Sequence, residues 1–317
     1  MAIIAIGPQR PTPSWRWVGR DLGEELARHH TVLFFDEFDQ VPDADVIFVV
    51  KQRPTLAFVK EAQARKACVG FAPIDIYETA SEIEADAEML RACDLVLLHG
   101  EELTPYIAAH TNRTLAVDHH LRFALDPSAE HNPGGFVLWI GATQNLLHLL
   151  AWLERNTLPY EVRLLTNISR EHWVLAHITA HRLGLKIRFD DGRINGHLAY
   201  QWSDARQDEM MRACGAAIDI KGTDFSQSTK PPTKAQQFIG SGIPFACNAN
   251  SPMARHFAKR GFDVAQPHDT ERLFSRAYWL ETQALSRQLR TELSLPAIAG
   301  RFWCAFDRMI ESRKVTS

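Results

Sequence analysis

Basic and hydroxyl side chains gather between residues 221 and 237, just beyond an apolar run of the sequence. The run AAIDIKG (216–222) reads as a buried strand, and KPPTKAQQFIGSG (230–242) as a helix that begins at two prolines and a capping Thr233. A helix start offers free backbone N–H groups and a partial positive charge, which attract phosphate. The side chains that could bind an anion or an adjoining sugar hydroxyl there are Lys221, Ser228, Thr229, Lys230, Thr233, Lys234 and Gln237.

The alternative for this cluster is that each lysine is merely solvated and that Thr233 is merely a cap. A single lysine favours that plain interpretation, because lysines are mostly exposed. Several such side chains at the end of one parallel strand, where α/β sheets bind ligands, favour an anion site instead.

Two further strand ends in the second half of the chain could contact a nucleotide. After FVLWIG, the turn at Gly141, Ala142 and Thr143 could present N–H groups to a pyrophosphate, or it could be an ordinary turn between strand and helix. After HLAYQ, Trp202 could stack on a base and Ser203 could hydrogen-bond it. Equally, Trp202 could belong to the core and Ser203 could cap the next helix.

Candidate acid–base residues lie at strand ends in the first half of the chain. A hydroxyl nucleophile needs a base, and imidazole or carboxylate can serve. The candidates are Asp75, His99, Asp118, His119 and His120. In the sequence DHH (118–120) adjacent histidines point to opposite sides, so we predict no metal site there. A structural role, in which the aspartate fixes a histidine tautomer, is the alternative to catalysis.

Short apolar runs alternate with helix-period segments along the whole chain, which is typical of parallel sheets in α/β proteins. The pattern restarts after LDPSAEHNPGG (125–135). We therefore predict two doubly wound domains, residues 1–128 and 129–317. The chain from about residue 268 onward reads as helical, with a break near LSLPAIAG (293–300), and these last helices could pack back on the first domain.

The short apolar runs predict the strands of both domains. In the first domain they are 2–7, 31–36, 45–50, 67–73, 94–100 and 114–120. In the second domain they are 136–142, 161–167, 186–191, 197–202, 216–222, 243–248 and 262–267.

Composition limits the class of partner. With 35 basic and 38 acidic residues among 317, the formal charge of −3 gives no global attraction to nucleic acid. We expect no signal peptide and no transmembrane run, and the five widely spaced cysteines fit a reducing cytoplasm. Peripheral contact with a membrane stays open.

The segment KPPTKAQQFIGSGIPFACN (230–248) resembles the donor-binding motif of GT-B glycosyltransferases, in which a lysine, a glutamate and Gly-x-Pro precede a strand. On this match Lys234 takes the lysine position, and Gly242 and Pro244 fall on Gly-x-Pro. Gln237 stands where the family has the glutamate that binds the donor ribose, and a glutamine can still hydrogen-bond there. The arginine–lysine pair that such enzymes often carry after the first strand of this domain is absent.

The resemblance implies two Rossmann-like domains with a deep interdomain cleft and C-terminal helices. It implies a nucleoside-diphosphate sugar as donor, bound mainly to the second domain, and an acceptor bound mainly to the first, with no metal and no other cofactor. The predicted function is therefore sugar transfer to a glycan, lipid-linked or small-molecule acceptor. The alternatives are a nucleotide-sugar epimerase of the same fold and a non-catalytic, two-lobed small-molecule-binding protein.

Overall fold

The computed structural model describes residues 1–126, 130–182 and 184–316, and it divides into two compact units. Unit 1 comprises Met1–Arg122, Asp224–Pro231 and Thr291–Ser317. Unit 2 comprises Phe123–Thr223 and Pro232–Arg290. The predicted boundary between residues 128 and 129 lies outside the described residues, and the chain passes between the units at several points.

Unit 1 is built on a six-stranded sheet in which all neighbouring strands are parallel. Its order is β2-β1-β3-β4-β5-β6. Each predicted run of the first domain contains one of these strands, which are β1 (Ile3–Gly7), β2 (Thr31–Phe34), β3 (Val46–Val50), β4 (Cys68–Ala72), β5 (Leu95–Leu98) and β6 (Thr114–Ala116).

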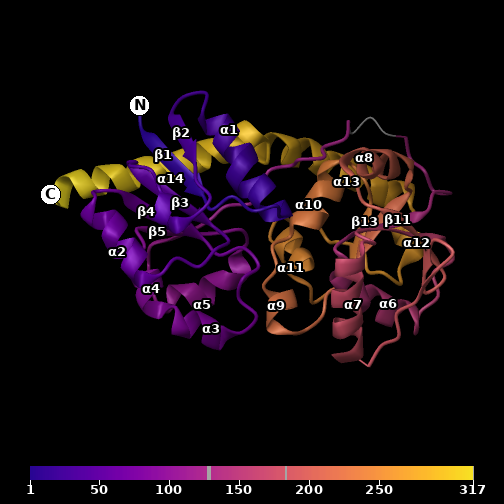
Figure 1. Cartoon of the computed structure of the whole chain (residues 1–317). Coiled ribbons are helices and arrows are strands. Elements are labelled where there is room, and N and C mark those ends of the chain that lie inside the picture. Colours follow the sequence, from indigo (N-terminus) through magenta and orange to yellow (C-terminus); the bar gives the residue numbers. More distant parts are fainter. Residues whose placement is uncertain (127–129, 183, 317) are drawn as a thin grey trace. The chain divides into compact units, whose positions relative to one another are not determined.

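Helices cover both faces of this sheet, as the all-buried β3 and β4 require. One face packs under α2 (Leu56–Ala64), α3 (Ala80–Ala85), α4 (Ala87–Ala92) and α5 (Thr104–Ala108). On the other face lie α1 (Leu22–Leu26) and the final helix α14 (Leu295–Thr316), as Figure 1 shows. Phe302 and Phe306 of α14 pack against Phe48 of β3. Further helical segments of unit 1 are η1 (Trp15–Asp21), η2 (Phe38–Gln40), η3 (Glu101–Leu103) and α9 (Phe225–Ser228).

Unit 2 has a seven-stranded sheet of order β13-β12-β7-β8-β11-β10-β9. Its strands are β7 (Val137–Gly141), β8 (Val162–Thr166), β9 (Phe189–Asp190), β10 (Arg193–Ile194), β11 (His197–Gln201), β12 (Ala216–Asp219) and β13 (Phe245–Cys247). Five of them form a parallel core, whereas β9 and β10 are antiparallel at the edge. The parallel sheet predicted for this half is thus confirmed in its core, whereas at one edge Gly192 and Gly196, both with positive φ, turn the chain back on itself.

Two other predictions in unit 2 need correction. The run 262–267 forms only an isolated bridge between Ala246 and Ala265, since the ladder does not continue on either side. Thr233 is the first residue of α10 rather than its cap, because Pro232 occupies the N-cap position. The predicted end of that helix is confirmed: α10 stops at Gly240, and Gly242 takes a φ of +73°.

The helices of unit 2 follow the alternation that the sequence predicts. They are η4 (Thr143–Asn145), α6 (Leu147–Leu153), α7 (Arg170–Arg182), α8 (Asp204–Ala213), α10 (Thr233–Gly240), α11 (Pro252–Ala258), α12 (Thr270–Leu273) and α13 (Arg276–Glu292). The predicted break near residue 293 separates α13 from α14. In the described part of the chain, no helix combines the length and the apolar character that crossing a bilayer would require.

Candidate functional site

The strand order of unit 2 places a topological switch point between β7 and β12. From β7 the chain runs through β8 to β11 on one side of the sheet, and then returns to add β12 and β13 on the other. Doubly wound sheets bind ligands outside the carboxyl ends of the two strands at such a reversal. In this unit those ends are Gly141 on β7 and Asp219 on β12.

A buried carboxylate, Asp219, holds two lysines at this switch point. The Nζ of Lys234 lies 2.9 Å from Oδ1 of Asp219, and the Nζ of Lys221 lies 2.9 Å from Oδ2. The indole Nε1 of Trp139 donates to Oδ1 at 3.0 Å. The Asp219 side chain is only 1% exposed, so it is shielded from water while its oxygens face cationic and polar partners.

The two lysines dominate the electrostatics of Asp219. Burial by itself would raise the pKa of this carboxyl group, but the charges and hydrogen bonds of Lys221 and Lys234 outweigh burial and lower the pKa to about 2. Asp219 is therefore ionised at neutral pH. Two ammonium groups and one carboxylate leave one net positive charge, which suits an anionic ligand.

Close packing fixes the position of Lys234. Its Nζ lies 4.4 Å from the centre of the Trp139 ring, within range of a cation–π interaction. A Cβ atom at Gly141 would come within 2.8 Å of that Nζ and 2.9 Å of the Trp139 ring. Glycine at 141 thus leaves the space that the lysine occupies. The Lys234 side chain is 23% exposed and Lys221 only 6%, so Lys234 is the better placed to meet a ligand.

The adjacent strand end supports Lys221. The backbone N–H of Lys221 donates to Oδ1 of Asn248, which follows β13, at 2.9 Å. The Asn248 amide in turn donates to the Lys221 carbonyl at 3.4 Å. These contacts tie together the loops after β12 and β13, so the lysine cluster rests on three neighbouring strands.

Several predicted ligand-binding residues of unit 2 have partners within the fold. Gln237 is buried, and its Oε1 accepts from the backbone N–H of Phe123 at 3.0 Å. Thr143 is also buried, and its hydroxyl donates to the Asn167 carbonyl, while Ala142 precedes the η4 turn. These hydrogen bonds satisfy the buried polar groups of Gln237 and Thr143, and the role of the residues towards a nucleotide stays a prediction.

At the end of β11, the two residues proposed for base binding also have local partners. The indole of Trp202 donates to Oε1 of Gln207 at 2.8 Å. Ser203 is the N-cap of α8, and its side chain accepts from the backbone N–H of Arg206 at 3.2 Å. The alternative that Ser203 caps a helix is thus confirmed. Trp202 is half-buried, so its indole remains partly accessible.

The structure divides the sequence cluster 221–237 between the units. Lys221, Thr233, Lys234 and Gln237 belong to unit 2, whereas Ser228, Thr229 and Lys230 belong to unit 1. Helix α9 was missed in the sequence, although Asp224 caps it by accepting from Gln227 N–H at 3.0 Å. Phe225 of α9 packs edge-on against Tyr106, at 4.9 Å between ring centres, and this apolar contact anchors the segment in unit 1.

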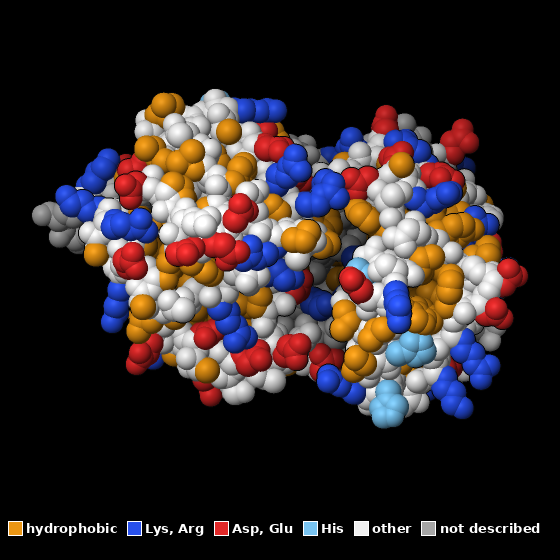
Figure 2. Space-filling model, viewed as in Figure 1, with side chains coloured by type: hydrophobic (Ala, Val, Ile, Leu, Met, Phe, Trp, Pro, Cys, Tyr) orange, Lys and Arg blue, Asp and Glu red, His pale blue; other side chains and the backbone are white. Residues whose placement is uncertain are grey.

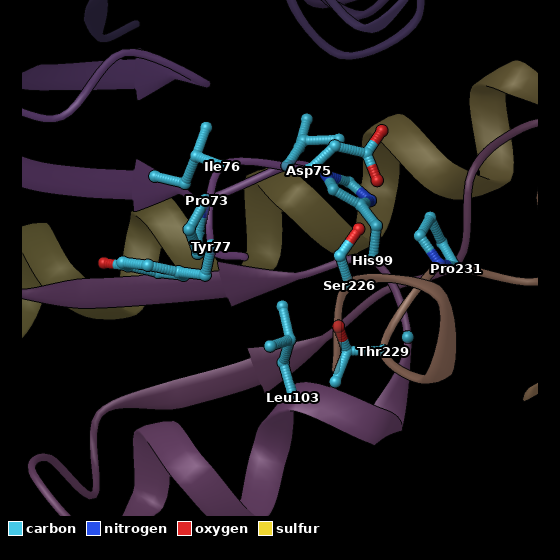
Figure 3. Close-up of a pocket in the computed structure, with 11 residues that line it drawn as sticks. Pro73, Asp75, Ile76, Tyr77, His99, Leu103, Ser226, Thr229 and Pro231 are labelled. Carbon is cyan, nitrogen blue, oxygen red and sulfur yellow. The ribbon is translucent and has the colours of Figure 1, made fainter. Parts of the chain in front are cut away.

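A pocket in unit 1 brings together two predicted catalytic residues. It lies at the carboxyl ends of the neighbouring strands β4 and β5 and is completed by the α9 segment. In Figure 3 the side chains of Asp75, His99, Ser226 and Thr229 line this pocket. Asp75 has a φ of +51°, a conformation that non-glycine residues seldom adopt and that often marks functional loops.

His99 has a defined tautomer. Its Nδ1 lies 3.0 Å from the carbonyl oxygen of Val117, so Nδ1 carries the proton and Nε2 keeps a lone pair. Nε2 is buried and has no hydrogen-bond partner among the described residues. Burial lowers the pKa of His99 to about 4, against the raising effects of the Val117 hydrogen bond and of the charges of Asp118 and Asp75. The imidazole is therefore neutral at pH 7.

The other candidate histidines support His99 or lie apart from it. His119 is buried and stacks on the His99 ring at 4.2 Å, and burial lowers its pKa well below the ordinary value. His120 turns away, with Nε2 3.2 Å from Oδ2 of Asp21. No group of three or more His, Cys, Asp or Glu side chains placed to hold a metal ion occurs among residues 1–126, 130–182 and 184–316.

Sequence reasoning missed two members of the lysine cluster, Asp219 and Trp139. A signal for Asp219 was present: a carboxylate ends the apolar run AAID and stands two residues before a lysine. A charged residue at the end of a buried strand needs a partner, so this pattern predicts an ion pair. Trp139 gave no comparable signal, because a tryptophan within an apolar strand usually belongs to the core.

The chain is similar in fold to solved structures of other proteins, although its sequence is not. Neither the protein-family models nor the curated protein sequences give a match to the chain. Among solved structures, AviGT4, a glycosyltransferase involved in avilamycin A biosynthesis, is similar with a TM-score of 0.60 and 11% identity over 98% of this chain and 99% of that one. A glycosyltransferase from Rickettsia africae has a TM-score of 0.61 and 8% identity over 97% and 98%.

A third similar structure is a putative UDP-N-acetylglucosamine 2-epimerase from Listeria monocytogenes, with a TM-score of 0.52 and 10% identity over 98% and 96% of the two chains. Together with the two parallel-dominated sheets, these likenesses show that the chain has the Rossmann-like, two-sheet fold of GT-B glycosyltransferases. The predicted fold class is confirmed in this respect, and the interdomain cleft stays a prediction.

Proposed function

We propose that the chain is a glycosyltransferase that takes its sugar from a nucleoside-diphosphate sugar. The observation that carries the proposal is the pair of lysines held by buried Asp219 at the switch point of unit 2. A cationic cluster at this place in a doubly wound sheet suits the diphosphate of a nucleotide. The similar structures named as glycosyltransferases support the same class of reaction.

Lys234 is proposed to contact the leaving diphosphate. As the bond between the sugar and the diphosphate breaks, negative charge grows on the diphosphate oxygen, and a fixed ammonium group stabilises that charge. The Asp219 carboxylate and the Trp139 ring hold Lys234 in place before the ligand arrives, so little reorganisation is needed. Gly141 keeps the strand end open for this side chain.

The pocket of unit 1 is proposed to bind the acceptor. The Nε2 lone pair of His99 would take the proton from an acceptor hydroxyl as its oxygen bonds to the anomeric carbon, while the nucleoside diphosphate leaves with the electron pair of the broken bond. The nearby Asp75 charge favours the imidazolium that results. His119, stacked on His99, holds the orientation of its ring.

The proposal is tested by calorimetric titration with UDP, GDP, TDP and CDP, with and without magnesium, followed by donor turnover assays. Saturable binding of one diphosphate identifies the base, and the magnesium arm tests the proposed independence of metal. If none of the four binds, the donor site is wrong. The cytoplasmic location and the absence of a further cofactor belong to this proposal as expectations.

A nucleotide-sugar epimerase is the second candidate, because one of the similar structures bears that description. The two activities give different products: a transferase releases free nucleoside diphosphate and a glycosylated acceptor, whereas an epimerase interconverts two nucleotide sugars without an acceptor. Tight binding without turnover of any donor would indicate the third alternative, a non-catalytic binding protein.

A further inference from the structure

Helix α7 of unit 2 has its apolar residues on the outside. Its fully buried residues are two alanines, Ala176 and Ala180. Its large aliphatic residues are exposed, with Val174 at 52%, Leu175 at 51% and Ile178 at 48%. A surface helix normally turns its large apolar side chains towards the core and its polar ones towards water. The reversed arrangement indicates that another surface covers this helix.

Six of the exposed residues of α7 form one continuous face, and Arg170 and His177, also exposed, border it. Glu171, Val174, Leu175, Ile178, His181 and Arg182 are all exposed, and each lies three or four residues from at least one other member of the set, so they share one side of the helix, with Leu175 and Ile178 near the middle. We call these six residues the α7 face. Phe189 on β9 is 43% exposed and packs against Trp173 of α7, which widens the apolar surface. Figure 2 shows apolar side chains gathered over this region, with histidine and basic side chains beside them.

The charges at the ends of the α7 face are complementary to each other. Glu171 lies in the first turn, and His181 and Arg182 lie in the last turn. The midpoint between positions 171 and 182 is also the midpoint between 175 and 178. A two-fold axis through that point would therefore place Glu171 against Arg182 of a second copy and Leu175 against Ile178 of that copy. Two-fold interfaces require this kind of self-complementary surface.

We propose that the α7 face is the site at which two copies of this chain pair, with the two α7 helices antiparallel. Antiparallel packing buries the aliphatic residues of both copies, forms two Glu171–Arg182 pairs and sets the helix dipoles in opposition. The α7 face carries Glu171 as well as Arg182, and a second copy pairs both charges, whereas an anionic membrane would set Glu171 against like charge.

The size of the α7 face predicts the strength of the dimer. A helix of 13 residues is about 20 Å long, and such a pair buries less than the standard interface of about 1,600 Å². We therefore expect a reversible dimer whose population rises with protein concentration. The inference concerns a different surface from the lysine cluster and does not rest on the proposed function.

The test is sedimentation velocity of the full chain over a wide concentration range. We expect conversion from monomer to dimer, and loss of the dimer in Leu175→Glu. The matched control is Leu280→Glu on α13, an equally exposed leucine at 52%, which should leave the dimer unchanged. Glu171→Arg and Arg182→Glu should each weaken dimerisation about tenfold, and the double variant should restore it.

Three results would overturn the proposal. The first is a wild-type chain that stays monomeric at every concentration, whether or not it co-sediments with vesicles of anionic lipid. The second is a dimer that Leu175→Glu leaves intact. The third is a double charge reversal that dimerises no better than the single ones. Circular dichroism of each variant checks that the fold is kept.

Discussion

At the scale of single residues, Asp219 organises the lysine cluster and stabilises unit 2. Buried ion pairs add little beyond an apolar alternative, yet removing one partner leaves an uncompensated buried charge. We expect Asp219→Ala to lower the free energy of unfolding by about 3 kcal/mol, measured by urea denaturation. Asp263→Ala is the control, since Asp263 pairs with Arg272 at the surface and should cost less than about 1 kcal/mol. Equal losses of unfolding free energy in the two variants would mean that Asp219 does not stabilise unit 2 as a buried partner of the lysines.

The same carboxylate predicts a dependence of stability on pH. The pKa of Asp219 is about 2 in the folded protein and ~3.9 in an unfolded chain, so the folded state favours the ionised form. Its contribution, on the order of a few kcal/mol, is complete above roughly pH 5 and is lost as the pH falls towards 2. The difference in unfolding free energy between wild type and Asp219→Asn should therefore shrink across that interval. A difference that stays constant would mean that Asp219 does not titrate as described.

His99 supplies the residue-scale prediction for catalysis. If its Nε2 is the base, His99→Gln should lower kcat by about 100-fold or more, while the dissociation constant for nucleoside diphosphate stays unchanged. The control is His110→Gln, in the same unit but away from the lining of the pocket. Full activity in His99→Gln would remove His99 from the reaction.

At the scale of the elements, the carboxyl end of β7 must leave room for Lys234. A Cβ atom at position 141 would meet the Lys234 ammonium and the Trp139 ring, so Gly141→Ala should displace the lysine. We expect destabilisation by about 1–3 kcal/mol and weaker binding of nucleoside diphosphate. Gly134→Ala is a matched control, because a Cβ there meets nothing within 4 Å. Identical binding by the two variants would separate Gly141 from the site.

The elements also show what could be predicted from sequence. Buried parallel strands such as VIFVV and CVGFA could be predicted because apolar runs of five residues between turn residues are too short for a typical helix. The edge hairpin β9–β10 could not be predicted in this way, because strands of two residues carry no periodicity. Lys234 could be found by its motif and position, whereas its partners Asp219 and Trp139 come from other strands, and only the fold brings them together.

At the scale of the whole molecule, the last helix completes the core of unit 1. Phe306 on α14 is fully buried, and its ring packs against Phe48 and Phe302. Phe306→Ala should lower the unfolding free energy of unit 1 by about 3–5 kcal/mol. The control is Arg301→Ala, at an exposed position of the same helix, with an expected change within about 0.5 kcal/mol. A Phe306→Ala chain as stable as wild type would contradict the observed packing.

The two-sheet fold of the whole molecule could be predicted from the sequence, but the assignment of one segment to its unit could not. The GT-B fold follows from the repeated strand–helix pattern and from one motif near residue 240. The assignment of Asp224–Pro231 to unit 1 could not be read from that pattern, because it depends on the contact of Phe225 with the side chain of Tyr106, about 120 residues away in sequence. The pocket around His99 follows from that contact, since Ser226 and Thr229 complete its lining.

One calorimetric comparison decides whether the lysine cluster at the switch point binds phosphate. The dissociation constant of the preferred nucleoside diphosphate is measured for wild type, Lys234→Ala and Lys186→Ala, the last being an exposed lysine of unit 2. We predict that Lys234→Ala binds at least about fivefold more weakly, or ~1 kcal/mol, while Lys186→Ala binds as wild type does. A folded Lys234→Ala protein with an unchanged dissociation constant would show that Lys234 does not bind the diphosphate.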